Sequence, residues 1–166
     1  MMAPPLFEII RMRRSAAISA VLAGGLIAGL VDIGAACLIY NVSPLIVLLS
    51  IASGILGRAA FSGGWEAATL GGVCHLLIAF CAAVAYVTAS SFILVLRRQA
   101  VLGGLAFGAL MFFFMHYIVV PLSNAVSGPM TPLLYAINLA DHMLLFGVPI
   151  ALSAKFFTGP KRVFGQ

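Results

Sequence analysis

The chain has 166 residues, of which 63% are hydrophobic and only 8% are charged. A soluble globular protein has roughly 45–50% apolar and about 25% charged residues, so nine basic and four acidic side chains are too few to cover a water-exposed surface. The same composition excludes a disordered chain, a coiled coil, a collagen-like fibre and a disulfide-stapled secreted module. The class that remains is an all-α membrane protein that crosses the bilayer several times.

Four apolar stretches are long enough to cross a membrane. A hydrocarbon core about 30 Å thick requires roughly 20 apolar helical residues for each crossing. The stretches are 16–40, 67–96, 100–120 and 133–154. Helices are preferred to a β-barrel because polar and apolar residues do not alternate and because a helix satisfies its own backbone hydrogen bonds. We therefore predict four transmembrane helices.

The basic residues predict the orientation of these helices. Eight of the nine fall on one side if both ends of the chain are cytoplasmic, and the ninth, Arg58, falls on the other. The eight are Arg11, Arg13, Arg14, Arg97, Arg98, Lys155, Lys161 and Arg162. This distribution predicts a cytoplasmic segment at 1–15, a transmembrane domain at 16–156 and a cytoplasmic tail at 157–166. The formal charge of +5 is thereby explained by topology and by contact with lipid headgroups, and we expect no nucleic-acid binding.

A shorter apolar segment, Pro44 to Gly57, lies in the first outer loop. Its length is typical of a re-entrant or interfacial helix and is too small for a full crossing. Asn41 and Ser43 are suitable N-caps, and Pro44 suits the first helical turn. We predict a short helix at the outer surface of the membrane.

Two pairs of glycines predict close contacts between helices. Gly25 and Gly29, and likewise Gly104 and Gly108, are four residues apart, which is the spacing that lets two helix backbones approach. Tight packing within one chain is the favoured interpretation. A homo-oligomer built on the same glycines stays open as an alternative.

Several polar residues lie within the predicted spans, where each is costly and where such groups usually face the interior of a bundle. They are Asp32, His75, His116, Asn138, Asp141 and His142. With the predicted orientation all six fall in the outer half of the membrane, as does Glu66. We therefore predict one polar cluster that opens toward the outside.

Three roles for this cluster compete. It relays protons or binds an ion or small solute, because histidine titrates near neutral pH and carboxylate–histidine pairs transfer protons. Alternatively, it ligates haem or a metal through His75 and His142, or it is structural and fixes the register of the helices. No motif of a hydrolase, zinc protease or nucleotide-binding enzyme is present, so we expect no enzyme and assign neither catalytic residues nor a metal or cofactor. A small transport-like protein is the preferred hypothesis.

One set of residues also carries a family resemblance. The set is, in chain order, His75, Tyr86, Gly104, Gly108, His116, Pro121, Leu122 and His142. With these residues and their spacing, 72–150 resembles the YagU-type family of small bacterial inner-membrane proteins, which have no assigned activity. The family pattern has an acid four residues before the last histidine, where this chain has Asn138, and Asp141 is the nearest carboxylate that takes its place. The resemblance implies a multi-pass protein of a bacterial inner membrane and adds weight to the three histidines.

Overall fold

A computed structural model of the chain describes residues 14–159, and within this range the protein is built of helices and contains no strand. The prediction of an all-α chain with several potential membrane spans is confirmed. Among residues 14–159, five helical segments, one more than predicted, are long and apolar enough to cross a membrane. They are Arg14–Tyr40, Pro44–Ser62, Gly64–Phe92, Ala100–Leu122 and Pro132–Thr158.

The first part of the chain forms two long helices joined by a short one. These are α1 (Arg14–Tyr40), α2 (Pro44–Leu56) with a 3-10 turn η1 (Gly57–Ser62), and α3 (Gly64–Phe92). Ser43 caps α2 as predicted, because its side chain accepts a hydrogen bond from the backbone N–H of Ile46 and Pro44 occupies the first turn. Asn41 has a different role: its φ of 50° places it in the left-handed region, so it makes the turn after α1 and does not cap α2.

The second part of the chain contains the short helix α4 and two long helical segments, each made of several consecutive elements. The elements are α4 (Leu94–Arg98), α5 (Ala100–Phe114), η2 (Met115–Val119), α6 (Val120–Leu122), α7 (Pro132–Asp141), η3 (His142–Gly147) and α8 (Val148–Thr158). The second span was predicted to continue to residue 96, which is wrong. It ends at Phe92 because Ile93 leaves the helical region, with φ −110° and ψ 88°, and the chain turns into the short helix α4.

The segments η2 and η3 are π turns, in which backbone bonds reach back five residues. The N–H of Val120 donates to Met115 O, and the N–H of Val148 donates to Met143 O. Each π turn comes just before a proline, Pro121 or Pro149. Because proline has no N–H and its ring clashes with the carbonyl four residues earlier, the helix widens at these points instead of continuing in the α form.

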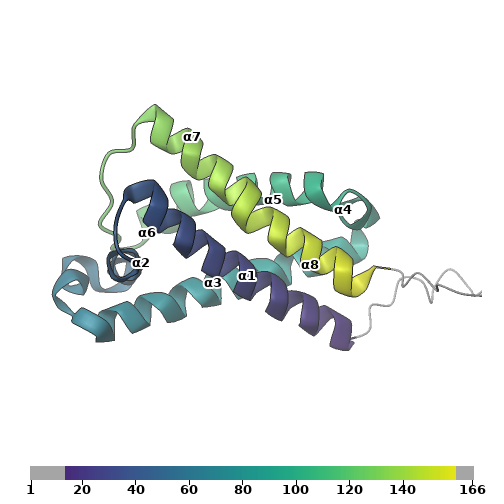
Figure 1. Ribbon diagram of the computed structural model, residues 1–166, viewed down its shortest axis with the longest axis horizontal. Coiled ribbons are helices and arrows are strands. Elements are labelled where there is room, and N and C mark those ends of the chain that lie inside the picture. The colour runs from purple at the N-terminus through teal and green to yellow at the C-terminus, as the bar shows by residue number, and fades with distance from the viewer. Residues whose placement is uncertain (1–13, 160–166) are drawn as a thin grey trace, which may run out of the picture.

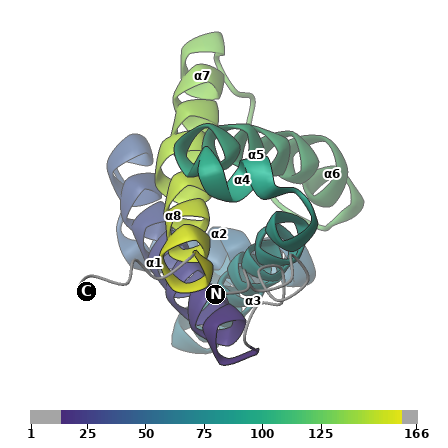
Figure 2. The ribbon, with the colours of Figure 1, turned by 90° about the vertical axis from the view of Figure 1, so that its right-hand side faces the viewer.

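The long helices run side by side along the molecule, and α2 lies across one end of them. In Figure 1, α1, α3, α5 and the α7–α8 rod extend lengthwise, whereas α2 is seen nearly end-on at the left. At the opposite end lie the start of α1, the end of α8 and the helix α4, and Figure 2 looks along the bundle from that end. We call the two ends the α2 end and the basic end.

The helix α2 is held at its end of the bundle by backbone contacts. A Cβ atom on Gly71 of α3 would collide with the backbone carbonyl of Leu48, so only glycine allows this approach. The connection after α6 also binds α2: Asn124 N donates to Gly54 O at 2.9 Å, and Val126 N donates to the Ser53 hydroxyl oxygen at 3.0 Å. The segment is therefore a packed part of the fold.

Most of the basic residues that the structure describes lie at the basic end. Arg14 begins α1, Arg97 and Arg98 end α4, and Lys155 lies in the last turn of α8. Arg97 Nη1 donates to Thr158 O at 3.4 Å and thus ties α4 to the end of α8. Arg58 lies in η1 beside α2, at the other end. Of the remaining basic residues, Arg11, Arg13, Lys161 and Arg162 lie outside the described residues, as do most of the two predicted cytoplasmic segments.

All four predicted packing glycines make contacts within the chain. Gly25 and Gly29 of α1 face Phe80 and Leu76 of α3, respectively. A Cβ atom on Gly104 would lie 2.7 Å from Val148 Cα, and one on Gly108 would collide with the carbonyl of His142. The small side chains buried around these contacts include Ala20, Ala28, Ala79, Ala83, Ala151 and Ala154. The glycines therefore serve the close approach of helices inside one molecule.

Candidate functional site

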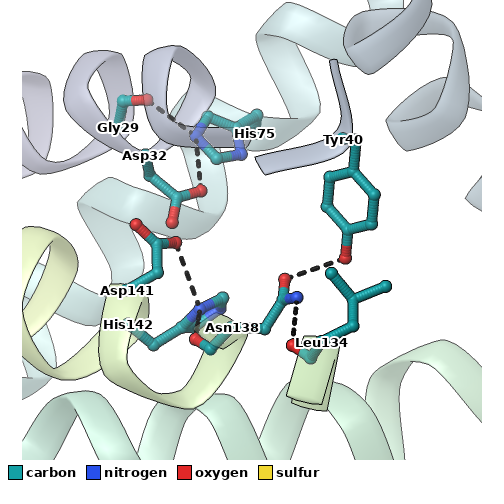
Figure 3. Close-up of polar contacts among 8 residues, drawn as sticks. All are labelled: Gly29, Asp32, Tyr40, His75, Leu134, Asn138, Asp141 and His142. Carbon is teal, nitrogen blue, oxygen red and sulfur yellow. Dashed lines mark hydrogen bonds and ion pairs between the residues drawn. The ribbon is translucent and has the colours of Figure 1, made fainter. Parts of the chain in front are cut away.

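Four ionisable side chains from three helical segments form a row between α1, α3 and the α7–η3 segment. The order across the row is His75 from α3, Asp32 from α1, Asp141 from α7 and His142 from η3, as Figure 3 shows. We call these four residues the His/Asp row. Distances of 3.7 Å join His75 Nε2 to Asp32 Oδ2 and His142 Nδ1 to Asp141 Oδ2. The structure therefore brings together four of the six polar residues that the sequence places in one cluster.

The first histidine is fixed by the backbone of α1. His75 Nε2 lies 2.9 Å from Gly29 O. Because a carbonyl oxygen only accepts hydrogen bonds, Nε2 carries the proton and Nδ1 of the neutral ring carries the lone pair. Gly29 permits this close approach of α1 and α3, since a Cβ there would lie only 3.2 Å from Leu76 and 3.3 Å from Ala79.

The second histidine is fixed within its own helix. His142 Nδ1 lies 3.0 Å from Asn138 O, one helical turn earlier. Nδ1 is therefore the protonated nitrogen, and Nε2 is the one that can accept a proton or bind a cation. The side chain of His142 is 23% exposed, so the ring is only partly enclosed by the protein.

The two carboxylates occupy the middle of the row. Oxygens of Asp32 and Asp141 and one ring nitrogen of His142 all lie within 4.8 Å of one another. The side chains of Asp32 and Asp141 are only 15% and 6% exposed, and Oδ1 of each is buried without a hydrogen-bond partner among residues 14–159. Buried polar atoms are nearly always partnered, so two free carboxylate oxygens in one place indicate a site that another species completes.

Asn138 lies beside the row and is hydrogen-bonded to Tyr40, a residue that was not among those predicted for the cluster. The Tyr40 hydroxyl donates to Asn138 Oδ1 at 2.9 Å, and Asn138 Nδ2 donates to Leu134 O at 2.7 Å (Figure 3). The first of these bonds joins the end of α1 to α7. Tyr40 comes eight residues after Asp32, so helical spacing places it two turns farther along, and that spacing was a usable signal.

His116 belongs to a neighbouring aromatic group and not to the row. Its ring stacks on Phe112 with a centroid distance of 5.6 Å and meets Tyr135 edge-on at 5.4 Å. Phe112 in turn contacts the ring of His142 at 5.5 Å. One phenyl ring therefore links the two histidines. Glu66 also lies outside the row, exposed in the first turn of α3.

The row lies in the half of the bundle nearer the α2 end. Asp32 is in the second half of α1, which runs toward that end, and His75 is in the first half of α3, which runs away from it. Asp141 and His142 likewise lie in the first half of the α7–α8 rod. Comparisons with protein-family models, with curated proteins and with solved structures gave no match, so the function has to be inferred from this geometry.

Proposed function

We propose that the protein is a small multi-pass membrane protein that takes up and passes on a proton or a small cation at the His/Asp row. The observation that carries the proposal is the pair of carboxylates Asp32 and Asp141, the first largely covered and the second buried, which face one another from separate helices. Among the described residues their ion-pair partners are two histidines, and neither carboxylate pairs with a lysine or an arginine. The row therefore lacks a permanent positive charge.

The electrostatic cost makes this arrangement depend on a cation. Two unit charges less than 5 Å apart repel by about 3 kcal/mol at an effective dielectric constant of about 20. Burial adds a desolvation cost for each ion. Asp32 and Asp141 therefore favour a state in which positive charge lies between or beside them, either as protons on the row or as a bound cation. Reversible uptake of positive charge inside a membrane is the step that proton relays and cation transporters need.

For the topology, we propose that the four lengthwise segments cross the membrane and that both ends of the chain are cytoplasmic. The basic end supports this orientation through the positive-inside rule. Pro44–Ser62 is long and apolar enough to cross, but α2 lies across the end of the bundle (Figure 1), and its 13 residues extend only about 20 Å before η1 begins. It would then lie at the outer surface, with the row in the outer half of the membrane. A bacterial inner membrane remains a prediction from the YagU-type resemblance.

The geometry argues against haem between His75 and His142. The two carboxylates lie between the two imidazoles (Figure 3), which leaves no place for a porphyrin that both rings would ligate. A structural role has one contact in its favour, the bond between His75 and Gly29 that joins α3 to α1. In that role Asp32 and Asp141 would have to share a proton, because each keeps a buried oxygen without a partner among residues 14–159.

Ion flux in proteoliposomes tests the proposal. Wild-type protein is reconstituted with an entrapped pH-sensitive dye or, in parallel vesicles, with an entrapped dye for divalent cations, and movement of both kinds of ion is followed after they are added to the outer buffer. We expect flux above protein-free vesicles, loss of that flux in Asp32→Asn, and wild-type flux in His116→Gln, whose ring lies outside the row. Equal flux in wild type and Asp32→Asn would contradict the proposal, as would wild-type vesicles that conduct neither protons nor any divalent cation.

A further inference from the structure

We propose that the cation bound at the row is a divalent first-row transition-metal ion such as Zn²⁺, held by Asp32, Asp141 and His142. The inference names the chemical class of the cation in the proposed function and rests on that function for its transport role, whereas the binding site stands on the geometry of the row. The three residues come from α1, α7 and η3, so the ion would connect helices that are far apart in the sequence.

The distances are close to those that a metal requires. Zinc bonds to carboxylate oxygen or imidazole nitrogen are about 2.0–2.2 Å long, which places neighbouring ligand atoms of a tetrahedral site roughly 3.5 Å apart. The three candidate ligand atoms lie within 4.8 Å of one another. A contraction of about 1 Å, available from rotation of the three side chains, therefore closes the site around one ion.

The donor atoms select the kind of metal. Two carboxylates and an imidazole form a mixed oxygen and nitrogen set, which suits Zn²⁺, Mn²⁺ or Fe²⁺. Ca²⁺ and Mg²⁺ prefer oxygen ligands alone and higher coordination numbers. A double negative charge from Asp32 and Asp141 is balanced by a divalent ion, whereas a monovalent ion would leave one carboxylate uncompensated.

The surroundings of the ligands fit the same interpretation. Asp141 is independent evidence for a ligand, because its side chain is only 6% exposed and its buried Oδ1, which lies in the row, has no partner among residues 14–159. His142 is held through Nδ1–H by the Asn138 carbonyl, as metal-binding histidines commonly are. Nδ1 is also the ring nitrogen next to Asp141, at 3.7 Å, so coordination through Nε2 would require the ring to turn toward the two carboxylates. Tyr40 steadies the same asparagine from α1.

The site would hold the ion without enclosing it completely. Three protein ligands leave one coordination position of a tetrahedral ion open, which is the arrangement of sites that exchange a ligand. His75 lies beside Asp32 but is held by Gly29 O, so we assign it a positioning role for the Asp32 carboxylate. An open position and a partly exposed His142 are what an ion needs if it is to leave again.

Calorimetric titration of the purified full-length protein in detergent, with any affinity tag removed, tests the inference. We expect one Zn²⁺ per chain at pH 7, bound with release of protons. Asp141→Asn and His142→Gln should each weaken binding about 100-fold, because they remove a direct ligand. His75→Gln should weaken it about 10-fold, at the low end for outer-shell residues. The matched control His116→Gln should bind Zn²⁺ as the wild type does.

Two results would overturn the inference. One is wild-type protein that binds Zn²⁺ no better than Mg²⁺, a result that needs no variant to fold. The other is an affinity that falls equally in His116→Gln and His142→Gln, which would place the metal elsewhere. The flux experiment separates the two proposals: Asp32-dependent proton flux without Zn²⁺ binding removes only the metal site, whereas Zn²⁺ binding without any flux removes only the transport role.

Discussion

The two halves of the bundle are stabilised in different ways. Toward the basic end, α1 meets α8 through Gly24, which lies against Ile150 and Ser153, and the surrounding side chains are small and buried. Toward the α2 end, the same pair of helical rods meets through Asp32 and Asp141, two carboxylates that gain little from each other. Close packing therefore stabilises the half toward the basic end, whereas repulsion between two carboxylates destabilises the half toward the α2 end.

The difference indicates how a small membrane protein supports a polar site. Helices in lipid associate through van der Waals packing and hydrogen bonds, since lipid tails are as apolar as leucine. Glycine and alanine contacts supply that packing at Gly24 toward the basic end, and Gly29 and Gly108 make close contacts beside the row as well. The packed half can therefore hold the helices in register while the row stays free to change its charge. Three substitutions test this division, and their expected effects on stability decrease from the first to the third.

Gly104→Val should cost the most. A Cβ at this position would lie 2.7 Å from Val148 Cα and 2.9 Å from Gly147 O, so the backbones of α5 and α8 have to separate. We expect the free energy of unfolding, measured in mixed detergent micelles, to fall by about 3 kcal/mol. Gly34→Val is the matched control, because nothing lies within 4 Å of a Cβ there. Equal losses in the two variants would show that helix propensity, and not packing, sets the stability.

Tyr40→Phe should have an intermediate effect. It removes the hydrogen bond to Asn138 Oδ1 that joins α1 to α7 near the row and leaves the ring in place. The expected loss is about 1 kcal/mol in the free energy of unfolding. Tyr117→Phe serves as the control, because its hydroxyl contacts only the exposed hydroxyl of Tyr135. If the two variants lose the same amount, the Tyr40 bond contributes nothing beyond a surface contact.

Asp141→Asn should have the smallest effect on stability and a large effect on function. The amide is nearly isosteric, and it removes one of two buried like charges, so we expect a thermal midpoint equal to or above that of the wild type. Cation binding and flux should be lost in the same preparation. A clear fall in the midpoint with flux retained would mean that the row is part of the packing, and the contrast between the two halves would disappear.

The helical segments were largely predictable because the bilayer sets their length. Predicted spans at 16–40, 100–120 and 133–154 end within four residues of the observed helices, and Ser43 and Pro44 indicated the start of α2. The break at Ile93 was not predicted, because residues 93–96 are as apolar as the rest of the span. Hydrophobicity predicts which residues can lie in lipid, but it does not predict the residue at which a helix ends and the backbone turns.

The site was predictable in its members more than in its geometry. Asp32, His75 and Asp141 stood out because ionisable groups are rare within spans, and the structure places them together. His116 satisfied the same criterion and belongs to an aromatic group, since its neighbours Phe112 and Tyr135 cover it. Tyr40 was missed because tyrosine is common near the ends of membrane helices and its partner lies 98 residues away.

The π turn at η3 sets the rotational phase of the last rod. In an uninterrupted α-helix, at about 100° per residue, Ile150 and Ser153 would point about 120° away from the side defined by Asn138 and Asp141. A π turn adds roughly one residue to the winding and cancels most of that offset. The same edge of the rod thus faces α1 along its whole length, toward Asp32 at one level and toward Gly24 at the other. Pro149, by forcing the wider turn, keeps the contact with Asp32 and the contact with Gly24 on the same side of the rod.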